Sequence, residues 1–535
     1  MSLASGRFSL GRRLATLLLF LAVAGCSTAS SPLAANSDYD RDLRMFSAAY
    51  GDIDDLYIRK VDMEGLALGG LSALAAIDPD ISAKRDGDRI DLLYKDQTVA
   101  ALATADNFGA DDWAALTAAG IAAARKASPV MAKADSEAIY KAVINGMLAR
   151  LNDPFSRYAG RDQAAENRAS REGFGGIGVY VSVDNGLVRI LSVQHYLPAE
   201  RAGLRPDDVI TEVDGVATKG LDQQQVVSML RGNVDSRVLL TIQRKSLAHP
   251  LVVAVTRVLV VPETVTYRRE GDIAYFRIYS FNEDTAASLR REFENARNEI
   301  GSRMRGVILD LRGDPGGVLD QAVAVADLFM DSGRIVSTHG RNPESHQYYE
   351  ATPGDIANGL PMAVLINGNS ASASEIVAAA LQDSGRAVLI GTNSYGKGTV
   401  QTVPRLPNNG EISLTWARYF APSGYTLNHI GVLPSICTNS GDQDATDLLS
   451  ALGEGKLNPV PVKARNATSP EDTAALDKLR ETCPAYKSSE RAVDLQVAIR
   501  LLSQPRLYAE ALALAALPGQ TPATQSALTQ DTVRP

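Results

Sequence analysis

Short apolar runs alternate with helix-patterned stretches across the middle of the chain, from about residue 260 to 435. The apolar runs have the length of buried strands, and they lie at 273–278, 305–312, 362–366 and 387–390. The stretches typical of helices lie at 283–300, 319–330 and 375–381. A chain that alternates strands and helices in this way favours an α/β core.

The region before this core has a different pattern. Helices rich in Ala and Leu are predicted at 63–77 and 138–151, and each runs into an acidic residue and a proline, which indicates a degenerate internal repeat. Two short strands are predicted between these helices, at 90–94 and 98–102. A further domain opens at Gly173, with strands at 179–183 and 187–193 and a helix at 223–230.

Beyond the core, short helices are predicted at 444–452 and 472–479, and a longer helix is predicted at 492–502. From about Pro518 the chain contains mainly Pro, Thr, Gln and Ala, which is typical of a disordered tail.

Composition bounds the function without specifying it. A chain of 535 residues has room for two to four domains, and 45% hydrophobic with 22% charged residues is ordinary for a globular protein. The formal net charge of −8, with no dense basic cluster, gives no support for nucleic-acid binding.

The amino-terminus has the pattern of an export signal. Three arginines precede the apolar run 14–22, which is too short to span a membrane in the mature protein, and Val23-Ala-Gly-Cys26 follows. The small residues before Cys26 resemble a bacterial lipoprotein cleavage box, which makes Cys26 the expected lipidation site. A plain secretory signal with an incidental cysteine is the alternative. Ser27, rather than an acidic residue, follows the cysteine, so we expect a lipid-anchored protein that faces the periplasm from the outer membrane.

Only Cys437 and Cys483 remain besides Cys26. An oxidising compartment would permit a disulfide between them, but the sequence gives no distance, so two free thiols remain equally open.

The strongest chemical signal is the stretch Asn367-Gly-Asn-Ser-Ala-Ser-Ala-Ser-Glu-Ile376. It joins a predicted buried strand to a predicted helix, so Ser372 is expected in a tight turn at a helix amino-terminus. Backbone N–H groups there are unpaired and partly positive, which suits a nucleophile whose attack creates an oxyanion. The competing interpretation is a simple helix cap, the usual role of serines in such positions.

A serine nucleophile needs a base, and none of the five histidines lies in a glycine- and serine-rich motif. Lys397, between Gly396 and Gly398, is the candidate, because a buried neutral lysine can deprotonate a serine. Gln401 is expected to hold the amine. The segment also approaches a phosphate-binding loop, but that motif needs Ser or Thr at position 398 and a helix after it, whereas residues 399–403 alternate like a strand.

Ser370-Ala-Ser-Ala-Ser-Glu375, Leu381-Gln-Asp383, Arg386 and Tyr395-Gly-Lys-Gly-Thr-Val-Gln401 together resemble the catalytic core of the carboxyl-terminal processing peptidases, or tail-specific proteases (peptidase family S41). The resemblance covers roughly residues 140 to 435. It implies a crotonase-like core with Ser372 as nucleophile, Lys397 as base and Gln401 as the orienting residue. It also implies that the backbones of Gly317 and Ala373 form the oxyanion hole. Asp314 stands where the family commonly has asparagine.

Residues from Gly173 to about Arg257 resemble a bacterial PDZ domain, which is β-sandwich-like. The resemblance places the carboxylate-binding loop at Gly176, Ile177, Gly178 and Val179, with the helix 223–230 as the other wall of a peptide groove. Convergent N–H groups in such a loop bind a chain terminus.

The predicted organisation has seven segments in an α/β, multidomain protein. They are a lipoprotein signal peptide (1–26), a tether (27–40), a mostly helical N-terminal region (41–165), the PDZ domain (168–258), the serine peptidase core (259–440), a helical C-terminal extension (441–517) and a disordered tail (518–535).

The function implied is an exported serine endopeptidase that cuts proteins near their carboxyl termini without metal or cofactor. Its partners would be proteins or peptides with free C-termini, the membrane through the lipid anchor, and an adaptor protein or further copies of the chain. Two alternatives come from other classes. A non-catalytic lipoprotein scaffold would have no need of Ser372, Lys397 and Gln401 together. A hydratase would need a cofactor site and catalytic carboxylates that the sequence does not show.

Overall fold

The computed structural model describes residues 37–439, 443–487 and 491–517. The predicted signal peptide with Cys26, most of the tether and the predicted tail lie outside these residues. The first helix, α1 (Ser37–Leu56), begins inside the segment predicted as a tether, so that boundary was placed too late. Asp38 and Asp40 lie in its first turn, where negative charge stabilises the positive end of the helix dipole.

A six-stranded sheet forms the centre of the predicted core. Its strands, in spatial order, are β13 (Val265–Glu270), β14 (Ile273–Ile278), β15 (Gly306–Asp310), β18 (Met362–Ile366), β19 (Val388–Gly391) and β22 (Ile436–Cys437). β13 is antiparallel to β14 and the other pairs are parallel. The carboxyl ends of β15, β18 and β19 therefore share one edge, where ligand and catalytic sites of open α/β sheets form.

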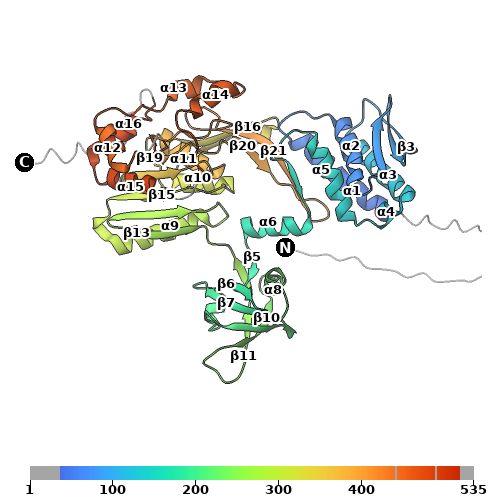
Figure 1. Ribbon diagram of the computed structural model, residues 1–535, viewed down its shortest axis with the longest axis horizontal. Helices are drawn as coiled ribbons and strands as arrows, with labels where there is room; N and C mark the ends of the chain where they lie inside the picture. The colour runs from blue at the N-terminus through green and yellow to red at the C-terminus, as the bar shows by residue number, and fades with distance from the viewer. Residues whose placement is uncertain (1–36, 440–442, 488–490, 518–535) are drawn as a thin grey trace, which may run out of the picture.

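Helices cover both faces of this sheet, because alternate residues of each buried strand point to opposite sides. Val307 and Leu309 pack with α9 (Thr285–Ile300), α10 (Leu319–Asp327) and α11 (Ala373–Asp383). Ile308, between them, packs with α12 (Ala445–Gly453), α15 (Ala492–Leu502) and α16 (Pro505–Ala513). The C-terminal extension thus supplies one whole layer of the core (Figure 1). Its two remaining helices are α13 (Val462–Ala467) and α14 (Thr473–Arg480).

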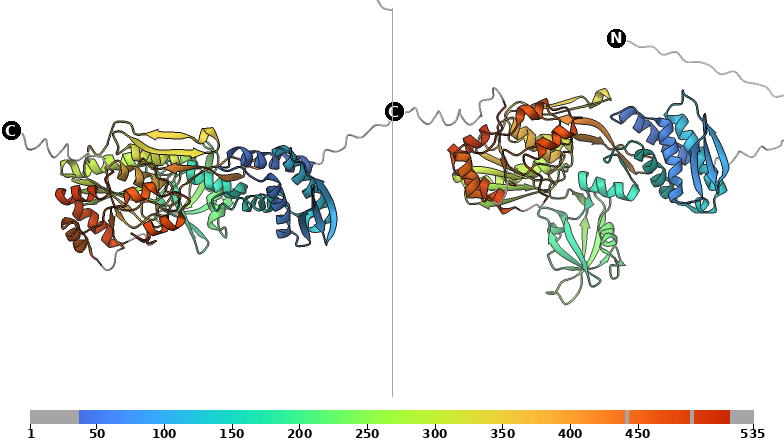
Figure 2. Two further views of the ribbon diagram at one scale, coloured as in Figure 1. Left: turned by 90° about the horizontal axis from the view of Figure 1, so that it is seen from above. Right: turned by 45° about the horizontal axis from the view of Figure 1, so that its top comes forward.

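A second sheet connects the core to the N-terminal region. Its strand order is β17 (Gln347–Glu350), β16 (Arg334–Gly340), β21 (Glu411–Phe420) and β20 (Thr399–Thr402), and β4 (Arg157–Ala159) also pairs with β21. Ile412 and Leu414 of β21 are buried among the N-terminal helices. Figure 2 shows β20 and β21 reaching from the core toward those helices.

The N-terminal region contains helices and a three-stranded antiparallel sheet. The helices after α1 are α2 (Met63–Ser72), α3 (Ala110–Ala127), α4 (Pro129–Lys133) and α5 (Ser136–Ala149), and the strands are β1 (Ile81–Arg85), β2 (Arg89–Tyr94) and β3 (Gln97–Ala103). The suspected repeat helices, α2 and α5, cross at Gly69 and Gly146. A Cβ on either glycine would lie 2.7 or 2.5 Å from the carbonyl oxygen of the other, so only glycine permits this approach.

The PDZ domain has its own hydrophobic core and projects from the rest of the molecule (Figure 1). Its sheet contains β6 (Val179–Asp184), β7 (Leu187–Val193), β8 (Val209–Val213), β9 (Val216–Ala217), β10 (Arg237–Gln243) and β11 (Leu251–Thr256). The short helix α7 (Pro198–Arg201) and the groove helix α8 (Gln223–Leu230) complete it. The chain enters this domain through β5 (Phe174–Gly176) and leaves it through β12 (Val258–Val260), and these two strands pair with each other. Helix α6 (Arg161–Glu172) precedes β5. Among the described helices none combines the length and apolar character needed to cross a bilayer.

Candidate active site

Ser372 lies in the turn between β18 and α11, at the carboxyl edge of the sheet. Its backbone has φ 56° and ψ −115°, in a region that residues other than glycine rarely adopt. Such a conformation costs on the order of 1–3 kcal/mol and persists where the surrounding structure enforces it, commonly at functional sites. In α/β-hydrolases a strained strand-to-helix turn of this kind, the nucleophile elbow, presents a serine hydroxyl above the sheet.

The three serines of the motif differ in their hydrogen bonds. Ser370 is fully buried, and its hydroxyl donates to Leu311 O at 2.8 Å. Ser374 is also fully buried, and its hydroxyl bonds Ala371 O at 2.9 Å and Asp314 O at 3.1 Å. Ser372 is half-buried. The structure therefore engages the outer two serines in packing, whereas Ser372 between them is only half-buried.

The turn after β15 packs directly on the Ser372 turn. Ala371 N–H donates to Asp314 O at 2.9 Å, and Gly316 N–H donates to the Asp314 carboxyl at 2.7 Å. A Cβ on Gly316 would lie 2.8 Å from Ala373 N, which shows how close the two turns are. Within the described residues, no acceptor pairs with the N–H of Gly317 or Ala373. Both predicted oxyanion donors thus belong to two adjoining turns and are available to a ligand.

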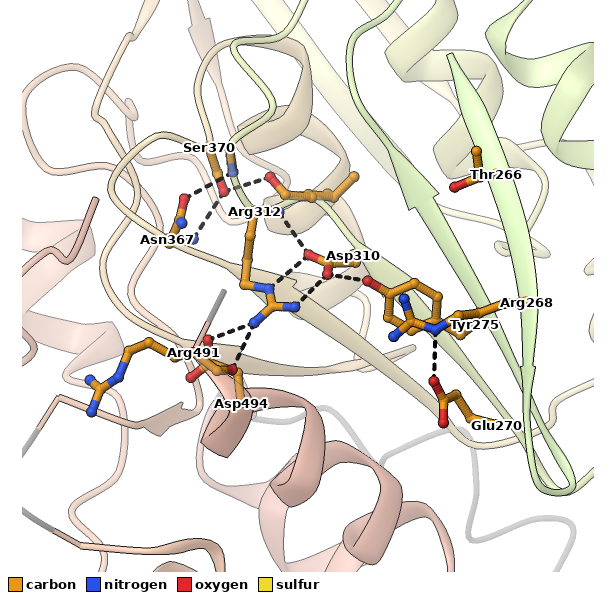
Figure 3. A network of polar contacts seen from close by, with 12 residues as sticks. Thr266, Arg268, Glu270, Tyr275, Asp310, Arg312, Asn367, Ser370, Arg491 and Asp494 are labelled. Carbon is orange, nitrogen blue, oxygen red and sulfur yellow. Dashed lines mark hydrogen bonds and ion pairs between the residues drawn. The ribbon is translucent and has the colours of Figure 1, made fainter. Parts of the chain in front are cut away.

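A buried ionic network anchors the end of β15 (Figure 3). The Arg312 guanidinium donates to both oxygens of Asp310, at 2.9 and 2.6 Å, and to Asp494 of α15 at 3.1 Å. Tyr275 O–H donates to Asp310 at 2.5 Å. Breaking a buried ion pair is costly, because it leaves a charge unpaired away from water. This network therefore holds in place the strand end that leads into the Gly316–Gly317 turn.

Lys397 lies in the loop after β19 and is half-buried. Burial lowers the pKa of its amine, and the positive charge of Arg157 lowers it further, whereas Glu375 and Asp153 oppose the change. The amine lies 5.1 Å from the centre of the Phe155 ring. Within the described residues no hydrogen bond joins Lys397 Nζ to Ser372 Oγ. The surroundings therefore favour the neutral amine more than solvent would, and the amine lies over a ring of the N-terminal region.

Glu375 connects the serine turn to the lysine loop. Its side chain is fully buried, and one oxygen accepts hydrogen bonds from Ser372 N at 2.8 Å and Lys397 N at 3.0 Å. The other oxygen accepts from Ser394 Oγ at 2.5 Å and Gly396 N at 2.7 Å. Burial raises the pKa of Glu375 to about 7, against the opposite effect of these four donors. The two predicted catalytic residues are thus held by one carboxyl group.

Among the described residues, Gln401 makes no hydrogen bond to Lys397. Its amide nitrogen donates to Thr399 Oγ1 at 2.9 Å and to Thr415 Oγ1 at 3.2 Å, within the β20–β21 pair. The expected orienting role therefore has no hydrogen bond to support it, because the strand register directs the amide to its own sheet.

A cavity of about 580 Å³ lies beside Phe155 and extends between the N-terminal region and the second sheet. Its wall combines aromatic, cationic and hydroxyl side chains, among them Tyr57, Arg59, Phe155, His339, Thr415 and Arg418. In the described part of the chain, no group of three or more His, Cys, Asp or Glu side chains is arranged to hold a metal ion.

The four residues predicted to bind a carboxylate line a groove of about 270 Å³ in the PDZ domain. Gly176, Ile177, Gly178 and Val179 form one side, and Gln223 and Val227 of α8 lie on the other. Gly178 has φ +82°, and a Cβ there would lie 2.5 Å from Leu197 Cβ, so glycine is required. The groove has the position and the two walls expected for an added peptide strand.

Cys437 and Cys483 form a disulfide, with Cα atoms 5.8 Å apart, which settles the alternative left open by the sequence.

Sequence reasoning missed Glu375, Ser394, Phe155 and Arg157 as parts of the site. The spacing Ser372-x-x-Glu375 was a readable signal, because a glutamate three residues after a capping serine bonds back to the serine N–H. Phe155 and Arg157 had no such signal, since only the tertiary fold brings them to Lys397.

Comparison with known proteins places these features in one family. A family model described as peptidase family S41 matches residues 272–438, and a PDZ domain model matches residues 189–244. The chain is 41% identical over 304 residues to the carboxy-terminal-processing protease of Bartonella bacilliformis, which covers 56% of this chain and 70% of that protein. It is 34% identical over 310 residues to a Staphylococcus aureus protein named "Probable CtpA-like serine protease", covering 57% of this chain and 61% of that one.

Among solved structures, it is similar to a photosystem II D1 C-terminal processing protease at 27% identity and a TM-score of 0.37, covering 74% of this chain and 92% of the other. With the S41 core, the PDZ domain and the extent of these matches, the chain belongs to the carboxy-terminal-processing protease family.

Proposed function

We propose that this protein is a serine endopeptidase in which Ser372 is the nucleophile and Lys397 the general base. The observation that carries the proposal is the Glu375 carboxyl, which binds the backbone N–H groups of both residues. A glutamate that only caps a helix needs only the hydrogen bond from the N–H group of its own turn, here Ser372 N. Here the same group also holds a lysine whose pKa burial lowers, as a lysine base requires.

The proposed reaction begins when the Lys397 amine leaves the Phe155 ring and accepts the Ser372 proton. Ser372 Oγ then attacks the scissile carbonyl, and the resulting oxyanion takes hydrogen bonds from Gly317 N–H and Ala373 N–H. The ammonium of Lys397 returns its proton to the leaving amine, which leaves an acyl-enzyme. Water, deprotonated by Lys397, hydrolyses that ester. The backbone of the lysine loop need not move, because Glu375 already fixes it.

The test is cleavage of tail-tagged model proteins by the purified full chain, with product masses recorded. Lys397→Met keeps an unbranched side chain of nearly the same length without a base, and we expect a loss of on the order of 10³-fold or more in kcat. Unchanged cleavage by Lys397→Met would exclude lysine as the base and direct attention to His339, which lines the adjacent cavity.

We also propose that the PDZ groove selects substrates by their free carboxyl termini. The support is the groove formed by Gly176 to Val179 and α8, whose glycine-dependent loop can direct N–H groups at a carboxylate. One substrate with a free C-terminus is compared with its C-terminally amidated twin, and the free form should bind more tightly and be cut faster. Equal binding and cleavage of the twins would show that the groove does not read the terminus.

Finally, we propose that the protein is exported and anchored by lipid at Cys26, facing the periplasm from the outer membrane. The leader pattern before Cys26 supports this, and the Cys437–Cys483 disulfide fits an oxidising compartment. Cys26→Ser should release the protein from membrane fractions or stall its processing. Membrane association that survives this change would assign attachment to another surface.

A further inference from the structure

The C-terminal extension reaches both loops of the candidate active site. Residues 480–487, here called the bracket, lie beyond the family match, which ends at residue 438. Tyr486 O accepts a hydrogen bond from Gly368 N at 2.8 Å, and Lys487 O accepts one from the Asn369 side chain at 2.6 Å. Both partners lie in the loop that leads into Ser372. The bracket is therefore attached to the nucleophile side of the site.

The same segment is attached to the lysine side. Tyr486 N–H donates to Thr392 Oγ1 at 3.0 Å, at the start of the loop that carries Lys397. At the other end of the bracket, the Arg480 guanidinium donates to Ser394 O at 3.2 Å. Ser394 is the residue whose hydroxyl bonds Glu375. The bracket thus spans from one catalytic loop to the other, outside the Glu375 connection.

Arg480 also fixes the chain that lies against the lysine loop. It donates to His429 O at 2.8 Å and to Ile430 O at 2.9 Å, and His429 N–H in turn donates to Gly396 O at 2.9 Å. A Cβ on Gly396 would lie 3.2 Å from an Arg480 nitrogen, so the guanidinium is packed against the residue before Lys397. One arginine therefore holds three carbonyl groups around this loop.

The disulfide is the strongest attachment of the bracket. Residues 481–487 are exposed except Cys483, so little apolar surface is buried to hold this segment in place. Cys483 is bonded to Cys437 at the end of β22, which pairs with Gly391 at the end of β19. The bond therefore ties the middle of the bracket to the sheet edge from which the lysine loop departs.

We propose that the bracket, held by the Cys437–Cys483 disulfide, is a positioning element for Ser372 and Lys397, and that peptidase activity requires this bond to be oxidised. The proposal rests on the proposed function, in which these two residues are catalytic. Reduction by a dithiol breaks the S–S bond with two electrons and two protons, gives two thiols, and converts the reductant to its cyclic disulfide. The bracket then keeps only its hydrogen bonds, which are exposed or partly buried, and the lysine loop loses part of its outer support.

The experiment compares the full chain, purified in detergent, before and after reduction with dithiothreitol, and the Cys437→Ser/Cys483→Ser variant. We expect kcat to fall about tenfold or more with KM nearly unchanged, because a misplaced catalytic group lowers the rate of the bound complex. The rising limb of the pH–rate profile should also move to higher pH, since a released Lys397 regains solvent. Dithiothreitol should have no effect on the double serine variant.

Arg480→Met and Arg480→Lys provide a second arm with the disulfide intact. Arg480→Met should reproduce the lower kcat and the alkaline shift, and Arg480→Lys should restore part of both, because an ammonium can still bind carbonyl oxygens. Leu512→Ala is the matched control: it removes a buried side chain of the same extension, in the helix layer away from both loops. It should lower thermal stability without moving the pH profile.

The outcomes separate the two proposals. If the oxidised chain cleaves no substrate, or if Ser372→Ala cleaves it equally well, the proposed function fails. If cleavage depends on Ser372 but the reduced chain and Arg480→Met both keep the wild-type kcat and pH profile, the positioning role is overturned. An unfolded double serine variant would shift the decision to the Arg480 variants.

Discussion

Replacing Glu375 with glutamine should separate stability from activity. Each carboxyl oxygen of Glu375 accepts two hydrogen bonds, from Ser372 N and Lys397 N on one side and from Ser394 Oγ and Gly396 N on the other. Either orientation of a glutamine amide places its NH₂ against two of these donors. Half of the connection between the serine turn and the lysine loop is therefore lost in the variant.

The effect on stability has a definite sign. Burial raises the pKa of Glu375 from 4.5 to about 7, so the folded state favours the protonated carboxyl. The stabilisation from this group is complete below pH 4.5 and is lost as the pH rises through about 7, a change of about 3 kcal/mol. Glutamine does not titrate. The free energy of unfolding of the wild type, minus that of Glu375→Gln, should thus fall by about 3 kcal/mol between pH 4.5 and pH 8.

As the pH rises, Glu375→Gln should gain stability relative to the wild type, but its activity should be lower than that of the wild type. At pH 8 we expect kcat to fall on the order of 100-fold, because displacement of a catalytic group by about 1 Å has effects of that size. The negative charge of Glu375 raises the pKa of Lys397, so its removal should also move the rising limb of the pH–rate profile to lower pH.

The unfolding assay is urea titration followed by the fluorescence of Trp416, in β21, in a background that carries Trp113→Phe. Glu411→Gln is the control, because Glu411 is also buried but is paired with Arg168 and Arg171, not with the loops that carry Ser372 and Lys397. A stability difference for Glu375→Gln that does not vary with pH, or a wild-type kcat, would refute the role assigned to this carboxyl.

Two other changes have defined outcomes. Gly316→Ala should abolish cleavage and destabilise the core by at least about 2 kcal/mol in urea titrations, because Gly316 has φ +92° and the new Cβ would lie 2.6 Å from Ala371 O and 2.8 Å from Ala373 N; a variant with normal kcat would show that the close fit of the two turns does not matter for cleavage. Asp314→Asn should keep activity, since Asp314 O and Gly316 N remain available. It should also raise the thermal midpoint increasingly as pH rises toward 8, because burial raises the pKa of the Asp314 carboxyl and one of its oxygens is buried without a partner; a midpoint difference that does not vary with pH would contradict this.

Much of the core could be predicted from local pattern. The apolar runs 362–366 and 387–390 are β18 and most of β19, and because adjacent parallel strands end at the same edge, the loops that carry Ser372 and Lys397 had to be neighbours. The helices 223–230 and 492–502 begin and end at the predicted residues, because polar or turn residues flank the apolar stretch of each helix at both ends. β1 was missed, since only Ile81 of its five residues is fully buried and its pattern is weak.

What local pattern could not give were contacts between distant segments. The position of the Lys397 amine depends on Phe155, which arrives through the N-terminal region. Cys483 of the disulfide and Arg480 come from the extension, which carries no recognisable motif. Gln401 was assigned by its spacing from Lys397 and by resemblance, and the strand register directs its amide to Thr399 and Thr415.

The identity of the nucleophile is tested most directly by comparing two alanine variants of one motif. Ser372→Ala and Ser374→Ala each remove one hydroxyl, two residues apart, and the Ser374 hydroxyl is the one engaged with Ala371 O and Asp314 O. The rate of cleavage of a tail-tagged model protein should fall at least about 10³-fold in Ser372→Ala, with an unchanged thermal midpoint. Ser374→Ala should lose about 1 kcal/mol of stability and keep most of its activity. Cleavage by Ser372→Ala at a rate close to that of the wild type would contradict the assignment of this serine as the nucleophile.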